Sequence, residues 1–375
     1  MLKIIEKYYI IIIGDDMKVI VTAGGTGGHI YPAISIINKI KELEPDSEFL
    51  YIGTHNRMEK DIIPKHNINY KALEIYGLSK KDMIRNFKNI FLIKKAYNEC
   101  IKIMKGFKPD VVVGVGGYVT YPVIMAAHKL NIKTFIHEQN SIPGKSNKLL
   151  SKYVDAIGVS FKDSEKYFKY PDKVYFTGNP CSENAIDIER ISKTRFGVKS
   201  TNKAILIVSG SLGSSVINNK MIEYLKSIEN KKYEVIYVTG KSYFEEFSKQ
   251  HFSRNVHIVP FIENMSGLLK DIDVIVSRAG ASSLSEIIAL KVPSIIIPSP
   301  YVANNHQYYN ALSLKNNDAC IMIEEKDLNK DILRTSIDKC LNEEFSNNLK
   351  NNMEQLAIKD SSTKIYNILS KLSKE

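Results

Sequence analysis

Three glycine-rich segments follow apolar runs in this chain, and residues of this type and order can bind an anion. They are residues 24–29 (GGTGGH), 114–120 (GVGGYVT) and 210–214 (GSLGS). A strand that runs into glycines and then into a helix leaves backbone N–H groups at the positive end of that helix, where a phosphate is stabilised. Three such segments in one chain predict a protein built around a ligand that carries a diphosphate.

Polar side chains follow the same kind of strand end at four places. His29 opens a predicted helix, where a neutral imidazole can accept a proton from a sugar hydroxyl. Residues 137–144 (HEQNSIPG) form a dense polar set after a strand, which indicates substrate contact. In residues 276–286 (VSRAGASSLSE), small side chains let a ligand approach the backbone, and Glu286 can take both hydroxyls of a ribose. The amides of residues 304–310 (NNHQYYN) suit sugar hydroxyls.

Short apolar runs alternate with helix-length stretches, which predicts an α/β protein with two doubly wound, Rossmann-like domains. Near-continuous apolar strands indicate parallel sheets covered on both faces. Ligands of such sheets lie outside the carboxyl ends of the strands, so we expect the active site in a cleft between the domains. The predicted strands are 19–23, 48–52, 69–73, 110–114, 133–137, 156–159, 173–176, 204–208, 234–238, 257–259, 274–276, 294–297 and 319–323, and helices are expected at 32–43 and 121–130.

The turn at residues 178–180 (GNP) separates the two series of strands. We therefore expect an N-terminal domain over 17–178 and a C-terminal domain over 179–359, followed by a helix over 360–375 with apolar residues at helical spacing. The apolar run 8–13 is far shorter than the roughly 20 residues of a membrane helix. Residues 1–16 are predicted to be a non-native or disordered extension before Met17, with a short membrane-touching arm as the alternative.

Composition and spacing exclude several classes of site. Cys100, Cys181, Cys320 and Cys340 are too widely spaced for a zinc site or a disulfide framework. No GxxxxGK[ST] motif is present, and the first glycine loop does not have the GxGxxG spacing of a dinucleotide site. The DxD spacing in residues 271–273 precedes a strand, away from the ligand edge, so no metal and no other cofactor is expected.

The net charge of +11 predicts an anionic partner, either a phosphorylated substrate, a membrane surface or nucleic acid. Residues 79–108 hold nine Lys and Arg against two acidic residues, with apolar side chains between them. This segment is either a helix with a solvated basic face or a surface that meets anionic lipid. No DNA- or RNA-binding motif appears, so nucleic acid is not expected as a partner.

Six segments in this order resemble the MurG family of glycosyltransferases, and the resemblance extends from Met17 to the C-terminus. They are 24–29, 114–122, 137–144, 178–180, 277–286 and 304–311. The resemblance implies a GT-B fold in which the C-terminal domain mainly holds the nucleotide sugar and the last helix packs on the N-terminal domain. It also implies inverting transfer of N-acetylglucosamine from UDP-N-acetylglucosamine to the 4-hydroxyl of lipid I, giving lipid II for peptidoglycan synthesis. A peripheral place on the cytoplasmic face of the cell membrane, near cell-wall and division proteins, is implied as well.

The same resemblance implies roles for particular residues. His29 is the candidate general base, Glu286 contacts the ribose, and Gln307 recognises the hydroxyls of N-acetylglucosamine. The remaining donor-site residues are Thr26, Gly27, Gly28, Asn140, Ser211, Ile262, Ala281, Ser282, Ser283, Leu284 and Ser285. The residues expected on the acceptor side are Gly116, Gly117, Tyr118, His137 and Glu138.

The chain departs from the family pattern at two places. Cys181 and Ser182 follow GNP where many members carry an arginine, so a charge contact to the nucleotide is missing or comes from Arg278 or Lys241. Leu212 stands where a glutamine is usual. Two other functions remain open: a UDP-N-acetylglucosamine epimerase of the same fold, which needs no lipid acceptor, and a basic nucleic-acid-binding protein, whose binding would depend steeply on salt.

Overall fold

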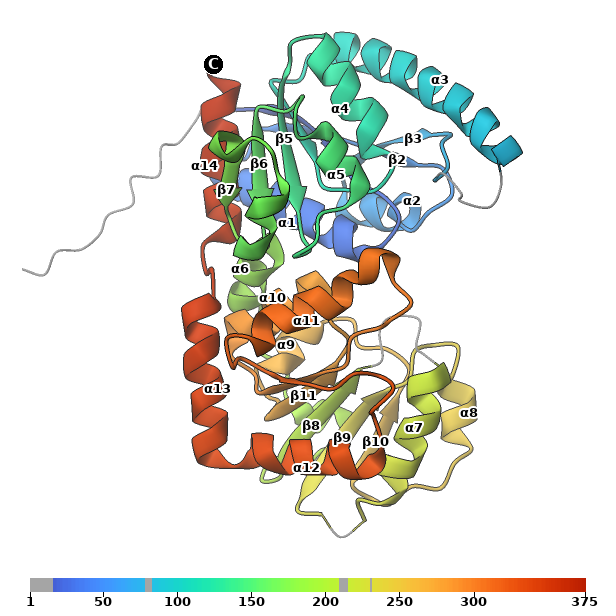
Figure 1. Ribbon diagram of the computed structural model, residues 1–375, viewed down its shortest axis with the longest axis vertical. Helices are drawn as coiled ribbons and strands as arrows, with labels where there is room; N and C mark the ends of the chain where they lie inside the picture. Colours follow the sequence, from blue (N-terminus) through green and yellow to red (C-terminus); the bar gives the residue numbers. More distant parts are fainter. Residues whose placement is uncertain (1–15, 78–82, 209–214, 230) are drawn as a thin grey trace, which may run out of the picture. The chain divides into compact units, whose positions relative to one another are not determined.

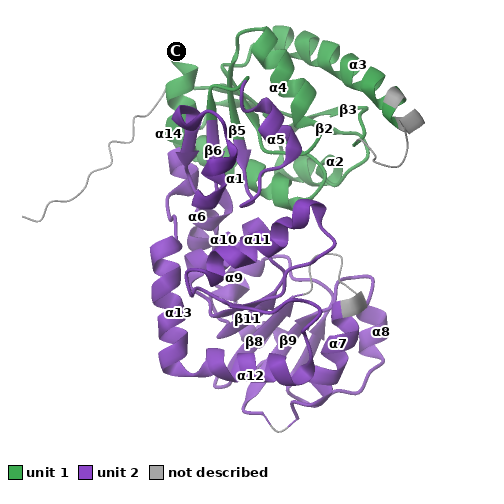
Figure 2. Cartoon of the chain, viewed as in Figure 1, with its two compact units in different colours: residues 1–136, 153–156, 365–375 green, residues 137–152, 157–364 purple. Residues whose placement is uncertain are grey.

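The computed structural model describes residues 16–77, 83–208, 215–229 and 231–375 (Figure 1). The chain forms two compact units, one from the described residues of Met1–Ile136, Tyr153–Ala156 and Ile365–Glu375, the other from His137–Lys152 and Ile157–Lys364 (Figure 2). Each unit combines parallel strands with helices. Three sequence features lie outside the described residues: most of the predicted N-terminal extension, the start of the basic segment with Lys80 and Lys81, and the third glycine loop with Ser211 and Leu212.

The first sheet has seven strands in the order β3-β2-β1-β4-β5-β6-β7. Strand β1 pairs in parallel with β2 and with β4, so the first two glycine loops leave neighbouring strands at the same edge. The strands are β1 (Lys18–Thr22), β2 (Glu48–Thr54), β3 (Asn69–Leu73), β4 (Val111–Gly114), β5 (Lys133–Glu138), β6 (Ala156–Val159) and β7 (Val174–Phe176).

The second sheet has six strands in the order β10-β9-β8-β11-β12-β13. Strand β11 pairs in parallel with β8 and β12, which puts the segment after β11 in the middle of the carboxyl edge. The strands are β8 (Lys203–Val208), β9 (Tyr233–Val238), β10 (Val256–Val259), β11 (Val274–Ser277), β12 (Ser294–Ile296) and β13 (Ile321–Met322).

Helices connect and cover these strands (Figure 1). The α-helices are α1 (Gly27–Leu43), α2 (Glu59–Ile62), α3 (Met83–Phe107), α4 (Thr120–Lys129), α5 (Lys145–Leu150), α6 (Pro180–Asp187), α7 (Ser215–Lys226), α8 (Phe244–Ser248), α9 (Met265–Leu269), α10 (Ala281–Leu290), α11 (His306–Lys315), α12 (Lys330–Leu341), α13 (Glu343–Leu356) and α14 (Ser361–Ser373). The 3-10 turns are η1 (Ile63–His66), η2 (Lys162–Tyr167), η3 (Pro171–Lys173), η4 (Lys193–Phe196) and η5 (Ala303–Asn305).

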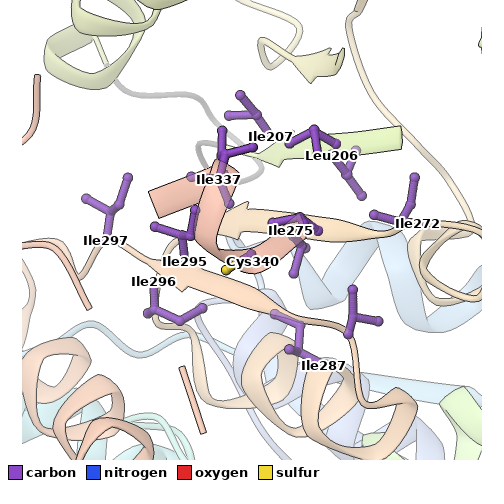
Figure 3. Close-up of a cluster of buried hydrophobic side chains, with 14 of the residues drawn as sticks. Leu206, Ile207, Ile272, Ile275, Ile287, Ile295, Ile296, Ile297, Ile337 and Cys340 are labelled. Carbon is purple, nitrogen blue, oxygen red and sulfur yellow. The ribbon is translucent and has the colours of Figure 1, made fainter. Parts of the chain in front are cut away.

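Each sheet is held by an apolar core. In the second unit, isoleucines of β8, β11 and β12 pack against Ile287 of α10 and Ile337 of α12 (Figure 3). Burying one such side chain contributes about 1.5–3 kcal/mol, so the strand runs themselves supply the main stabilisation. In the first unit, Ile365 and Leu369 of α14 join the core of β1 and α1, and the Tyr366 hydroxyl donates a 2.8 Å hydrogen bond to Glu44.

The predicted α/β fold with two Rossmann-like parallel sheets is confirmed. Each of the predicted strands is present, and its ends differ from the prediction by at most two residues. One helix prediction was wrong at its start, because α1 begins at Gly27 rather than at Pro32. Pro32 lies in the second turn, where its missing N–H removes a single bond to the carbonyl of Gly28. The earlier start carries the glycine loop directly into the helix.

The four cysteines are buried, and none of them forms a disulfide bond within the described part of the chain. Among the described residues, no helix combines the length and the apolar character that crossing a membrane requires.

Candidate functional site

In the first unit, the loops that follow β1 and β4 touch through their glycines. The Gly24 N–H donates a 3.2 Å hydrogen bond to the carbonyl of Gly116, which also accepts the Thr120 hydroxyl at 2.8 Å. Gly116 and Gly117 have φ of +111° and +88°, a region that disfavours other residues. A Cβ on Gly117 would lie 2.5 Å from the carbonyl oxygen of Gly24, so this close approach requires glycine.

His29 packs against this pair of loops. Its Nδ1 lies 3.0 Å from the carbonyl oxygen of Gly24. A carbonyl oxygen only accepts, so this contact assigns the proton to Nδ1 and, in the neutral ring, the lone pair to Nε2. The Nε2 edge lies over Gly116, where a Cβ would be 2.9 Å from Nε2. The ring is partly exposed, so Nε2 is placed to accept a proton.

The start of α1 has the features of an anion site. Thr26 is an extended N-cap whose side chain makes no capping bond, and the first intrahelical bond runs from the His29 N–H to the Thr26 carbonyl. The N–H groups of Gly27 and Gly28 therefore precede the bonded part of a 17-residue helix. In the adjoining loop, the Tyr118 hydroxyl is buried and has no hydrogen-bond partner among the described residues.

Sequence reasoning missed Glu59, a fully buried residue at the start of α2. Its Oε2 accepts the Gly25 N–H at 3.2 Å, and its Oε1 accepts both the N–H and the hydroxyl of Thr54. No motif marks this residue, since a glutamate in a first helical turn ordinarily indicates a solvated helix end.

In the second unit, one buried amide joins two of the predicted segments. Asn310 of α11 is fully buried, and its Oδ1 accepts the N–H and the hydroxyl of Ser141, each at 2.9 Å. Its Nδ2 donates to Asn140 Oδ1 and to the carbonyl of Ala279, both at 3.2 Å. The structure thereby brings residues 137–144 next to the loop after β11, although 169 residues separate Ser141 from Asn310.

His137 and Glu138 hold that segment from inside. Burial lowers the pKa of His137 to about 4, so the ring is neutral, and its two nitrogens contact the Gly178 carbonyl and the Gln139 amide, each at 3.0 Å. Glu138 is 2% exposed, and its carboxylate accepts hydrogen bonds from Asn140, Gly144 and Asn147. The structure thus gives both side chains internal partners, which is the arrangement of positioning residues.

The start of α10 presents small residues after an extended Gly280 N-cap. Ala281 and Leu284 are buried, Ser283 is exposed, and Ser285 donates a 2.7 Å hydrogen bond to the Ser282 carbonyl. The Ser282 hydroxyl is buried without a hydrogen-bond partner in the described part of the chain, as expected for a group that a ligand would satisfy.

Glu286 occupies the second turn of α10 and is partly exposed. Burial raises the pKa of Glu286 to about 7, and a hydrogen bond from Ser266 opposes this shift. The carboxyl therefore changes its charge near neutral pH, which makes it able to respond to a ligand that donates hydrogen bonds.

The remaining candidates lie on neighbouring loops of the second sheet. Gln307 accepts the Ser299 N–H at 2.9 Å, Ile262 is 4% exposed, and the Lys241 ammonium lies 5.4 Å from the centre of the Phe261 ring. Asn304 and Asn305, just before α11, both have positive φ. This strained pair fixes the direction in which α11 and Gln307 leave the loop.

The structure distinguishes Arg278 from Lys241, the two residues predicted to replace the charge contact of the missing arginine. Arg278 forms a 2.6 Å ion pair with Glu325 and donates to the Ile297 carbonyl, so its guanidinium is held in the interior. Lys241 is exposed. Cys181 and Ser182 are themselves buried in the first turn of α6.

The DxD carboxylates have cationic partners. Asp271 pairs with Arg190 at 2.5 Å, and Asp273 pairs with Lys203 at 2.7 Å. These ion pairs tie the segment before β11 to the first residue of β8 and to the segment after α6.

Comparison with known proteins identifies two family models in this chain. Residues 19–159 match the glycosyltransferase family 28 N-terminal domain, and residues 204–367 match its C-terminal domain. The UDP-N-acetylglucosamine–N-acetylmuramyl-(pentapeptide) pyrophosphoryl-undecaprenol N-acetylglucosamine transferase of Bacillus pumilus is 42% identical, covering 95% of this chain and 100% of the relative. The Bacillus licheniformis enzyme of the same name is 41% identical over 95% of this chain and 99% of its own.

Solved structures of related proteins have the same fold as this chain. MurG of Acinetobacter baumannii has a TM-score of 0.75 at 25% identity, covering 95% of this chain and 99% of that one. UDP-N-acetylglucosamine 2-epimerase of Neisseria meningitidis has a TM-score of 0.66 at 15% identity, covering 95% and 100%. The second likeness shows the shared fold alone.

Proposed function

Because the chain belongs to glycosyltransferase family 28, we propose that it transfers N-acetylglucosamine from UDP-N-acetylglucosamine to undecaprenyl-pyrophosphoryl N-acetylmuramyl-pentapeptide, the lipid I of peptidoglycan synthesis. The observation that carries this proposal is the full-length 42% identity to relatives named for that reaction. The enzyme is a hexosyltransferase. The epimerase alternative is supported only at the level of the fold, since the identity to the epimerase structure is 15%.

We assign the chemistry as an inverting displacement. The acceptor 4-hydroxyl attacks the anomeric carbon from the face opposite UDP, and its proton passes to Nε2 of His29. The Nδ1–H contact with Gly24 supports this role, because it leaves the Nε2 lone pair available. The UDP leaving group keeps its negative charge, which the N-terminus of α10 stabilises through its N–H groups.

We assign donor binding mainly to the C-terminal domain, residues 179–359, and acceptor binding to the N-terminal domain, residues 17–178. Glu286 takes the ribose hydroxyls and Gln307 the sugar hydroxyls. Gly116, Gly117 and Tyr118 lie on the acceptor side, and the unpartnered Tyr118 hydroxyl supports that assignment. His137 and Glu138 act on the acceptor side by positioning residues 139–144, because their own polar atoms are bonded internally.

The test supplies the purified protein with donor alone and then with a lipid I analogue. We expect N-acetylglucosamine to appear on the analogue, with UDP released in equal amount. Donor alone should stay unchanged, and formation of the 2-epimer from donor alone would establish the alternative instead.

We also propose that the protein attaches peripherally to the cytoplasmic face of the membrane, where the lipid acceptor lies and where cell-wall and division proteins assemble. Helix α3 supports this proposal. Ile90 and Phe91 are 59% and 72% exposed, and Lys88, Lys94 and Lys95 are exposed around them. Apolar side chains within a basic rim are typical of helices that lie on an anionic bilayer.

Reversing Lys80, Lys81, Arg85 and Lys88 to glutamate should therefore weaken binding to anionic vesicles and leave UDP binding intact. Each basic residue near such a surface contributes about 1 kcal/mol, screened by salt within roughly 8–10 Å. Vesicle co-sedimentation at low and high salt measures the effect. The matched control reverses four exposed lysines of the second unit, Lys199, Lys330, Lys339 and Lys350. Equal losses in both variants would show a general charge effect and remove α3 as the docking face.

A further inference from the structure

One peptide bond in the first glycine loop faces two titratable side chains. The Gly25 N–H donates to Glu59 Oε2 at 3.2 Å, and the Gly24 carbonyl of the same peptide unit contacts His29 Nδ1 at 3.0 Å. In a trans peptide the N–H and the C=O point in opposite directions. Glu59 and His29 therefore lie on opposite sides of the Gly24–Gly25 peptide and are linked through it.

Burying the Glu59 carboxylate costs folding free energy, because the charge loses its hydration. It is 0% exposed, and none of the ion pairs among the described residues includes it. Three hydrogen bonds hold its carboxylate, at 3.2 Å from Gly25 and at 3.0 and 2.6 Å from Thr54. A buried charge without a cation is weak evidence for stability, because its desolvation opposes folding. A specific role in the loop explains its presence better than stability does.

Two neighbouring glycines leave the space that the Glu59 side chain occupies. A Cβ on Gly24 would lie 3.0 Å from Oε1, and a Cβ on Gly53 would lie 2.8 Å from the Glu59 Cγ. The buried Tyr51 and the half-buried Tyr70 also feel it: burial raises the pKa of each, and the negative charge of Glu59 raises it further. Tyr51 donates to the carbonyl of Ala23, directly before the loop, so the phenol and the carboxylate bind two consecutive peptide units.

The structure shows one orientation of the Gly24–Gly25 peptide, and its two glycines permit the opposite one. The peptide joins two glycines, and Gly25 has a φ of +101°, so a flip that exchanges N–H and C=O meets no Cβ. A carboxylate only accepts hydrogen bonds, so Glu59 selects the orientation that points the N–H towards itself. That choice turns the carbonyl towards His29, whose Nδ1 must then carry the proton.

We propose that Glu59 is a positioning residue for the transfer reaction, holding His29 in the Nδ1–H tautomer through the Gly24–Gly25 peptide. This inference rests on the proposed function in one respect, that Nε2 of His29 receives the acceptor proton. In many proteins a carboxylate hydrogen-bonded directly to an imidazole fixes which ring nitrogen carries the proton. Here the carboxylate of Glu59 fixes it through one intervening peptide.

The test variant is Glu59→Gln, which keeps the shape and removes the charge. Its amide must turn an NH₂ towards either Gly25 or Thr54, and a flip of the glycine peptide relieves the clash at Gly25. The flipped N–H then faces Nδ1 and favours the Nε2–H tautomer, which cannot act as the base. We expect kcat to fall by about 10²-fold or more, within the usual range for general-base catalysis, with little change in the donor KM. The ¹⁵N NMR shifts of His29 should report the exchanged tautomer.

Tyr70→Phe is the matched control, because it removes a 2.6 Å hydrogen bond to Thr54 beside the carboxylate and leaves the linked peptide intact. It should keep wild-type turnover, and thermal unfolding should show that both variants are folded. In a His29→Ala background, Glu59→Gln should cost little more, since both act on one step. An equal loss in both backgrounds would overturn the inference. If His29→Ala itself retains turnover, the proposed base is wrong, and an unchanged His29 tautomer in Glu59→Gln still overturns the positioning role separately.

Discussion

His29→Ala is expected to lower kcat by about 10²–10⁴-fold, the usual contribution of a general base. The reason lies in the geometry of the ring. Nδ1 is committed to the Gly24 carbonyl, so the neutral ring presents its lone pair at Nε2. Alanine removes this proton acceptor from the incoming hydroxyl. Turnover should fall while the KM for the donor changes little, because His29 itself is assigned to proton transfer and not to donor binding.

The measurement is steady-state transfer to a lipid I analogue, with His66→Ala as the control. His66 is an exposed histidine in the same unit, in the turn after α2, and its removal should leave kcat unchanged. Thermal unfolding of both variants separates a catalytic loss from a folding defect. Full turnover in His29→Ala would remove this residue from the mechanism.

The fold could be predicted because its signal is local. The runs that became β1, β4, β8 and β11 are almost entirely apolar, since these strands lie inside parallel sheets and are covered on both faces. The glycine loops were equally readable, because positive φ and close backbone contact leave few alternatives to glycine. In these places a short stretch of sequence is enough to determine the local structure.

The site contacts that escaped prediction depend on distant partners. Glu59 acts on Gly25 across 34 residues, and Asn310 holds Ser141 across 169. Glutamate and asparagine are also common on solvated surfaces, so the residue type does not reveal these contacts. They become visible only in the folded structure. The place of His137 and Glu138 on the acceptor side stays a prediction. The structure shows that His137 contacts the Gly178 carbonyl and that Glu138 accepts a hydrogen bond from Asn147.

Glu286→Ala is expected to weaken binding of UDP-N-acetylglucosamine by about 10- to 150-fold. Loss of a charge-assisted hydrogen bond costs about 1.5–3 kcal/mol, and a ribose offers two hydroxyls to this carboxylate. Isothermal titration with the donor measures the change. Glu246→Gln, which neutralises an exposed carboxylate on α8 of the same unit, should bind the donor as wild type does.

The same carboxyl should make donor binding depend on pH. Burial raises the pKa of Glu286 to about 7 from the ordinary value of 4.5, so the unliganded carboxyl is mostly neutral below pH 6. Ribose hydroxyls donate hydrogen bonds, so they favour the ionised form, and binding should tighten as the pH rises. If only that form binds, the Kd at pH 5.5 should be about 30-fold weaker than at pH 8. The donor is a suitable probe because its diphosphate is esterified at both ends and does not titrate in this range.

Stability should change in the opposite direction over the same interval. The unfolded chain releases the Glu286 proton near pH 4.5, whereas the folded protein keeps it until about pH 7. The folded state therefore binds more protons between these values, and its free energy of unfolding falls as the pH rises through them, then levels off. Glu286→Gln holds a neutral side chain at every pH, so it should abolish this decline and flatten the donor-binding profile together. A variant that flattened only the stability curve would show that Glu286 has a structural role and makes no contact with the ribose.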